Sequence, residues 1–194
     1  MTNYIALIVL ISIFHSSQSQ VPGFGRCPAV NIVQNFDVAR YMGLWYEVRK
    51  YPFIFQLGGK CTTAEYTLQA DSTVKVVNTQ VRNGAEDSVI GSATLVKPGV
   101  GSLTVTFPQA PFTSEGNYNV LYTDYESLAV VYSCSSFLGF LNAKSMWILT
   151  RERFPSTDVI EKAYEVLRDN DVSTIFISQT NQKECAERVK FNAV

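Results

Sequence analysis

The chain has 194 residues, 16 Lys and Arg against 17 Asp and Glu, and a formal net charge of −1 at pH 7. This length suits one domain with a sizeable core. The sequence has no basic stripe and no run of Lys and Arg, so we expect no nucleic-acid partner.

The chain begins with an apolar segment. Residues 5–14 are almost wholly apolar, which is too short to cross a membrane and fits the hydrophobic region of a secretory signal peptide. Ser17 and Ser19 are small residues at the −3 and −1 positions before Gln20. The sequence therefore predicts a signal peptide over residues 1–19 and a secreted mature chain over 20–194. A buried or frayed N-terminal helix is the alternative.

Removal of that segment would also remove His15, which is the single histidine. A Ser-His or Cys-His nucleophile, a His-rich zinc site and an imidazole-ligated haem are then excluded. We expect no metal and no required cofactor. Four cysteines remain, and an even number in a secreted chain predicts two disulfides with three pairings open. The cysteines are Cys27, Cys61, Cys134 and Cys185.

The middle of the chain reads as a series of strands. A polar segment leads into Gly43-Leu44-Trp45, and short runs rich in β-branched and aromatic residues follow, separated by turn signals such as Asn83-Gly84 and residues 98–101. Eight strands with short or moderate connections favour an antiparallel barrel or sandwich. The predicted strands are 43–51, 61–68, 72–82, 86–97, 102–108, 116–125, 127–134 and 144–152.

After the eighth strand the apolar period changes. Pro155 fits a helix start, and Ile160, Ala163, Tyr164 and Leu167 form one apolar stripe at helical spacing. The pattern predicts one amphipathic helix that packs outside the sheet. A brief strand over 174–178 should follow.

Alternation along the strands sorts side chains into two faces. Lys75 suits solvent, so we expect the opposite face of its strand to point inward. A mainly apolar interior with a few polar groups results, and eight strands are just wide enough for one small ligand. A barrel filled by its own side chains is the alternative, and the directions of Glu47 and Arg49 stay open. The expected inward residues are Val74, Val76, Asn78, Gln80, Tyr118, Val120, Tyr122, Ser145, Trp147, Leu149 and Arg151.

Three separated motifs resemble those of the lipocalin family. The segment Asn35–Glu47, centred on Gly43-Leu44-Trp45, resembles the first motif, and Thr123-Asp124-Tyr125 resembles the second. Arg151 occupies the place of the third. The similarity covers essentially the whole mature chain and is specifically to the branch of apolipoprotein D and the insect bilin-binding proteins.

The resemblance implies an all-β fold: an eight-stranded antiparallel up-and-down barrel with one C-terminal α-helix packed outside, over residues 20–194. It also implies the disulfides Cys27–Cys134 and Cys61–Cys185, which could each contribute about 4–5 kcal/mol because each closes a long loop. Trp45 would close the barrel floor after Gly43, with Arg151 over its ring. These three residues would be structural and would not touch ligand.

The resemblance also suggests which residues bind. It assigns Tyr66, Asn78, Tyr118 and Trp147 to the pocket, where the rings would stack on a ligand and Asn78 would meet its polar atoms. The secondary candidates, for which core packing is an equal alternative, are Gln80, Val89, Val105, Phe107, Val120, Ser133, Phe53 and Phe55.

Three expected loops at the open end are apolar: Phe53-Ile54-Phe55, Ala110-Pro111-Phe112 and residues 137–141. A clustered apolar patch typically marks an interaction surface. Our hypothesis is that this rim contacts a membrane, a lipoprotein particle or a second copy of the chain. Folding of the loops into the pocket mouth is the alternative.

The sequence therefore predicts a secreted carrier for a small hydrophobic ligand such as a lipid, fatty acid, retinoid, sterol or bilin-type pigment. A bound bilin or other chromophore is one candidate. Some lipocalins are enzymes that use a lumenal thiol, but all four cysteines match bridging positions, so we expect no enzyme. A protein that acts only through its apolar rim is the third hypothesis.

Overall fold

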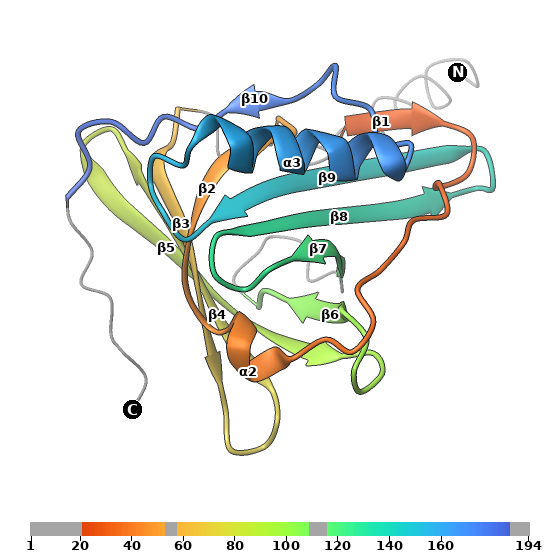
Figure 1. Ribbon diagram of the computed structural model, residues 1–194, viewed down its shortest axis with the longest axis horizontal. Helices are drawn as coiled ribbons and strands as arrows, with labels where there is room; N and C mark the ends of the chain where they lie inside the picture. Colours follow the sequence, from red (N-terminus) through yellow and green to blue (C-terminus); the bar gives the residue numbers. More distant parts are fainter. Residues whose placement is uncertain (1–20, 53–57, 109–115, 187–194) are drawn as a thin grey trace, which may run out of the picture.

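The computed structural model describes residues 21–52, 58–108 and 116–186 (Figure 1). Their core is a closed antiparallel barrel in which each strand pairs with the next and the last, β9, pairs back with β2. The predicted eight-stranded barrel is confirmed. Its strands are β2 (Gly43–Lys50), β3 (Lys60–Leu68), β4 (Val74–Arg82), β5 (Ala85–Leu95), β6 (Ser102–Thr106), β7 (Gly116–Thr123), β8 (Leu128–Phe137) and β9 (Leu141–Thr150).

Two short strands add to the barrel. β1 (Val21–Phe24) pairs with the start of β9 and was not predicted, because Pro22 and Gly23 weaken its strand pattern. β10 (Ser178–Gln179) pairs with β2. The prediction of a strand over 174–178 was wrong for residues 174–177, where the backbone turns and the N–H of Ile177 donates to the carbonyl of Thr174.

The β8–β9 hairpin is longer than predicted. β8 continues to Phe137 and β9 begins at Leu141, so these two residues pair as strand ends and the connection shrinks to residues 138–140. The turn is tight because Leu138 and Gly139 both adopt positive φ angles, of 51° and 77°. The predicted loop over 137–141 is therefore reduced to residues 138–140.

The helix α3 (Thr157–Asp169) lies outside the barrel, as predicted, across β8 and β9 (Figure 1). Two apolar clusters result. One fills the lower interior around Trp45, Val120 and Leu149, and the other lies between the barrel wall and α3, around Met146 and Leu167. The β8–β9 wall is thus covered on both faces. Neither this helix nor the short α2 (Val38–Tyr41) is long and apolar enough to cross a membrane, and the described residues hold no other candidate.

Bulges change the faces of two strands. In β7 the register shifts between Val120 and Tyr122, so one extra residue is accommodated and the alternation is reset. Tyr122 packs in the outer cluster, where the Lys162 ammonium lies 5.6 Å from its ring centroid. The prediction that Tyr122 points inward was therefore wrong.

The end of the described chain fills a split in the barrel wall. β2 pairs with β3 only over Gly43–Tyr46, and the segment 178–182, here called the C-terminal strap, runs between the two strands beyond that point. The N–H of Thr180 donates to the carbonyl of Val48, and the N–H of Cys61 donates to that of Asn181. The strap thus completes the wall.

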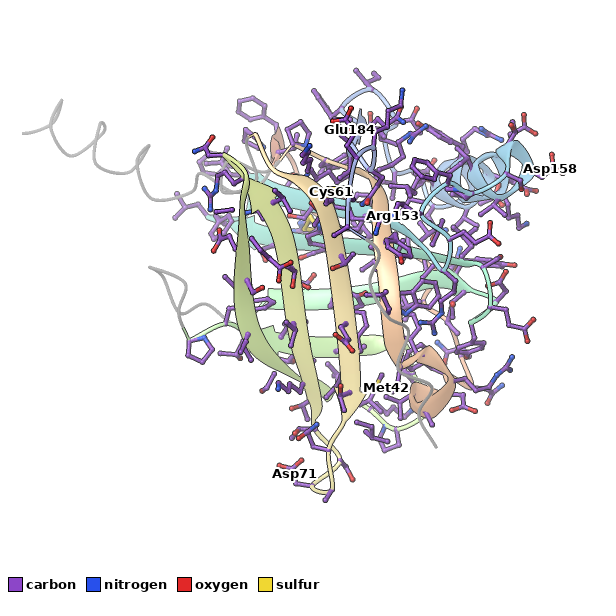
Figure 2. The ribbon with its side chains drawn as sticks, turned by 90° about the vertical axis from the view of Figure 1, so that its left-hand side faces the viewer. Met42, Cys61, Asp71, Arg153, Asp158 and Glu184 are labelled. Carbon is purple, nitrogen blue, oxygen red and sulfur yellow. A yellow bond between two sulfur atoms is a disulfide. The ribbon has the colours of Figure 1, made fainter. Side chains whose placement is uncertain are left out.

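Two disulfides fasten the chain, with the pairing that the resemblance implies. Cys27–Cys134 ties the N-terminal segment to β8, and Cys61–Cys185 ties β3 to the segment after the strap. Figure 2 shows Cys61 beside this segment.

Candidate ligand-binding site

The floor of the barrel is a plug of Trp45 and Arg151. Trp45 is fully buried, and the Arg151 guanidinium carbon lies 3.7 Å from its ring centroid. Arg151 also donates hydrogen bonds to the carbonyls of Leu44, Met42 and Tyr125 at 2.8–3.0 Å. These contacts engage the guanidinium group of Arg151, so Arg151 holds the end of the barrel closed.

Gly43 is needed beside this plug. Its φ angle is +90°, and a Cβ at this position would lie 3.4 Å from Nη1 of Arg151. A larger residue would therefore strain the backbone and crowd the guanidinium.

Three tyrosines meet directly above the floor. The hydroxyl of Tyr118 on β7 lies 2.8 Å from that of Tyr41 on α2 and 2.9 Å from that of Tyr66 on β3. We call these residues the tyrosine triad. Three hydroxyls carry three protons, and their two mutual hydrogen bonds use two of them. One O–H of the triad therefore remains to donate to a ligand, and several lone pairs remain to accept.

Burial changes the acidity of the triad. It raises the pKa of Tyr66 to about 12, and it raises those of Tyr41 and Tyr118 well above their ordinary value. All three hydroxyls are thus protonated at neutral pH. They offer neutral hydrogen bonds and no charge.

Trp147 extends the triad into an aromatic wall. Its ring stacks on Tyr118 with centroids 6.4 Å apart and an interplanar angle of 23°. Tyr66 meets Tyr118 edge to face, with centroids 6.2 Å apart. The structure therefore brings together three of the four primary candidate residues. Tyr41 also belongs to this group, although it was not assigned to the pocket from the sequence. Its position four residues before Trp45 could have indicated that it lies near the floor.

The fourth primary candidate, Asn78, lies beside this aromatic group on β4. It pairs with Ala64 on β3, which follows the same face as Tyr66. Its amide makes no side-chain hydrogen bond to the described residues. Asn78 is thus available to meet a polar atom on a ligand.

The secondary candidates spread around the lumen. Phe107 lies against Gly91, where a Cβ would come 2.6 Å from its ring, and with Val105 and Val120 it packs on the inner cluster. Ser133 is buried opposite Ser145. Nearer the mouth, Gln80 donates to Asp87 at 3.4 Å, and Val89 is 41% exposed opposite Asn78. Phe53 and Phe55 lie outside the described residues.

A bulge at Val48 determines the directions of the Glu47 and Arg49 side chains, which the sequence left open. Glu47 pairs with Leu149 and Lys50 with Trp147, both on the inner face, whereas Arg49 pairs with the outward Ile148. The Lys50 ammonium lies 2.9 Å from Oε1 of Glu47, which also accepts a hydrogen bond of 2.7 Å from Thr180. This buried ion pair on the lumenal side was not predicted.

The described part of the rim is strongly apolar. Phe137, Leu138 and Phe140 are 49%, 82% and 56% exposed. β1 adds Phe24, which is 89% exposed and pairs with Leu141. The apolar loops over 53–55 and 110–112 lie outside the described residues.

The described residues offer neither a metal cluster nor a free thiol. They contain no cluster of three or more His, Cys, Asp or Glu side chains suited to a metal ion. All four cysteines form disulfides, which leaves no lumenal thiol to act as a nucleophile.

Comparisons with known proteins agree with this geometry. A family model described as a lipocalin-like domain matches residues 36–182. The chain belongs to the lipocalin family. Apolipoprotein D from Rattus norvegicus is 34% identical to this lipocalin, and the similarity covers 96% of this lipocalin and 98% of the rat protein. Bilin-binding protein from Pieris brassicae is 35% identical over 75% of this lipocalin and 78% of the insect protein.

Solved structures give the same fold. Insecticyanin from Manduca sexta superposes on this lipocalin with a TM-score of 0.75 and 25% identity, over 85% of this chain and 90% of insecticyanin. Lobster apocrustacyanin A1 gives a TM-score of 0.74 at 20% identity, over 84% and 92% of the two chains, and supports the fold alone.

Proposed function

We propose that this lipocalin is a secreted carrier that binds one small hydrophobic molecule in its barrel lumen. The observation that carries the proposal is the combination of an apolar and aromatic lumen with a few uncommitted polar groups. Such a combination is typical of small-molecule sites. The spare O–H of the tyrosine triad and the Asn78 amide would orient the ligand.

The aromatic wall favours a flat or conjugated ligand. Trp147 and Tyr118 present nearly parallel rings, on which a planar molecule can stack. A bilin-type pigment fits this description, and one relative is named for bilin binding. A fatty acid, sterol or retinoid fits the apolar wall equally, and the relatives named apolipoprotein D support a lipid. No catalytic group enters this proposal.

Secretion is part of the proposal. The apolar residues 5–14 and the small residues before Gln20 support a signal peptide over 1–19. The two disulfides also support it, because disulfides persist in oxidising compartments.

The first test is to purify the secreted protein and record its absorption spectrum, followed by mass spectrometry of an organic extract. We expect about one small hydrophobic molecule per chain. Visible bands would select a pigment, whereas a colourless extract with fatty acids would select a lipid. Recovery of no molecule, together with no binding of added retinol, oleate or biliverdin, would exclude the carrier function.

The second test places the ligand. Trp147→Ala and Asn78→Leu should each weaken binding of the extracted molecule by about tenfold, because they remove a stacking surface and a polar contact. Tyr122→Phe is the matched control on the outer face. Equal effects of the inner and outer variants would contradict a lumenal site.

A second activity is supported by the rim. Phe24, Phe137, Leu138 and Phe140 form an exposed apolar edge at the open end, and such patches mark interaction surfaces. This rim would dock on a membrane or lipoprotein particle, or on a second copy of the chain. Changing Phe137, Leu138 and Phe140 to Ser should reduce liposome flotation or self-association. Unchanged behaviour in both assays would remove this activity.

A further inference from the structure

A second concave surface lies on the outside of the barrel. It is a groove of about 530 Å³ between the outer edge of β2, the strap and the start of α3. We call it the outer groove. Figure 2 shows Arg153 on this side of the barrel, near Cys61 and Glu184. Its lining includes Arg49, Arg153, Phe154, Ile160 and Lys183, together with the polar strap residues 179–182.

The charge of the outer groove is entirely positive. Arg49, Arg153 and Lys183 line it, and no carboxylate does. None of the three cations forms an ion pair with a described residue. The adjacent carboxylate, Glu184, lies outside the lining and pairs with Lys60 at 3.9 Å.

The three cations differ in the contacts that they make within the protein. Arg153 stacks over the ring of Tyr46 at 4.7 Å and donates to Gln182 at 3.1 Å and to the carbonyl of Ala186 at 3.0 Å, so it fastens the end of the chain. Among the described residues, the Arg49 side chain donates only to the carbonyl of Val48. The ammonium of Lys183 contacts no acceptor among the described residues. The fold therefore does not require the charges of Arg49 and Lys183.

Four apolar residues and the four polar strap residues 179–182 make up the remainder of the lining. Ile160 contributes aliphatic surface, and Phe154 is 64% exposed beside Arg153. Pro155, which precedes the N-cap Ser156, and Ile160 place the start of α3 next to the cations. Ser156 makes no side-chain cap to the helix, and Asp158 is the acidic residue of the first turn. Positive charge and apolar surface thus lie side by side.

We propose that the outer groove binds a single anionic amphiphile at a site separate from the lumen. The phosphate or carboxylate head would accept hydrogen bonds from Arg49, Lys183 and the free edge of Arg153. Guanidinium groups suit this role because their planar donors match both head groups. The first carbons of the tail would lie on Phe154 and Ile160. A groove of this volume is large enough for a small ligand.

The test uses dodecyl phosphate below its micelle-forming concentration and the full secreted protein. Two-dimensional NMR follows the side-chain Nε–H signals of Arg49 and Arg153, which report on the outer groove and not on the lumen. We expect both signals to shift with saturable dependence on the probe. The double variant Arg49→Gln/Lys183→Gln should weaken that binding, measured on Arg153, by about tenfold or more.

The control variant is Lys75→Gln/Lys97→Gln, which removes the same charge from exposed positions elsewhere on the barrel. It should bind dodecyl phosphate as the native protein does. Equal weakening by both double variants would overturn the proposal, since a general charge effect would then explain it. Equal shifts with the neutral dodecyl maltoside would exclude anion recognition, and equal affinity for inorganic phosphate would exclude a role for the tail.

These outcomes are independent of the carrier function. Loss of the lumenal ligand in Trp147→Ala should leave the Arg49 and Arg153 signals responsive to dodecyl phosphate. A loss of response in that variant would show that the probe binds in the lumen. This result would overturn the proposal of an outer site and would leave the proposed carrier function intact.

Discussion

Tyr118 joins the two other members of the tyrosine triad. Its hydroxyl is the shared partner of Tyr41 and Tyr66, and these two hydroxyls are otherwise enclosed by apolar and aromatic side chains. A buried hydroxyl that loses its partner loses free energy, because it has also been removed from water. The stability of the barrel floor and the polarity of the pocket therefore depend on the same oxygen atom.

We predict that Tyr118→Phe lowers the free energy of unfolding by roughly 1–3 kcal/mol, because it leaves two buried hydroxyls unpaired. Urea denaturation followed by tryptophan fluorescence measures this change. Tyr122→Phe is the control. Tyr122 lies four residues further along β7, on the outer face, and its hydroxyl has no hydrogen-bond partner among the described residues. A similar loss in both variants would contradict the role of the triad.

Asp124 controls the turn between β7 and β8. One of its oxygens accepts hydrogen bonds of 2.8–3.0 Å from the N–H groups of Glu126, Ser127 and Leu128, and the Ser127 hydroxyl donates to the other oxygen. Partial burial acts to raise the pKa of this carboxyl, but the hydrogen bonds outweigh it and hold the pKa below its usual value. The ionised form is thus favoured by folding.

A lowered pKa in the folded state gives stability that is present above the unfolded value, about 3.9, and is lost as pH falls through the folded value. We therefore predict that Asp124→Asn is less stable than the native protein at pH 7 and that the difference narrows below about pH 4. Chemical denaturation across this range measures it. A difference that stays constant with pH would show that Asp124 acts through shape alone.

The C-terminal strap is the element on which the wall between β2 and β3 depends. Besides its backbone bonds, Gln182 donates to the carbonyls of Glu47 and Thr62 at 2.8 and 2.7 Å, which bridges the two separated strands. Thr180 bonds to Glu47 and so fixes one partner of the buried ion pair. Cys61–Cys185 holds this arrangement at its end.

Replacing Cys61 and Cys185 by Ser should lower the free energy of unfolding by roughly 2–5 kcal/mol, because the bridge closes a loop of 124 residues. It should also weaken ligand binding, since Glu47 and Lys50 lose the support of the strap. Calorimetric unfolding and ligand titration measure the two effects. Replacing Cys27 and Cys134 is the comparison, and we expect a similar loss of stability with less effect on binding.

The periodic pattern of apolar residues predicted the regular parts of these strands and of α3. Alternation placed Val74, Val76 and Trp147 inside, and the helical stripe placed α3 outside. The bulges at Val48 and near Leu121 have no such pattern, because a bulge inserts one residue without a distinctive residue type. The directions of Glu47, Arg49 and Tyr122 follow from these bulges. The sequence therefore left the first two directions open and gave the wrong direction for Tyr122.

At the scale of the whole molecule, the three motifs far apart in sequence meet at the floor. The backbone N–H of Asp37 donates to the Tyr125 hydroxyl, and Arg151 donates to the carbonyls of Tyr125 and Arg40. The barrel and this plug were predictable because a single family pattern covers them. The tyrosine triad and the outer groove were not, because each depends on side chains brought together from three or more elements.

The covering of β8 and β9 on both faces has a further consequence for motion. β8 and β9 share ten registered pairs beneath α3, whereas β6 shares four with β5 and four with β7. Few pairs and more exposed backbone favour local opening. We expect amide hydrogens of β6 to exchange with deuterium well before those of β8. The barrel would then open locally along the two edges of β6, and the residence time of a tightly held ligand would follow that opening.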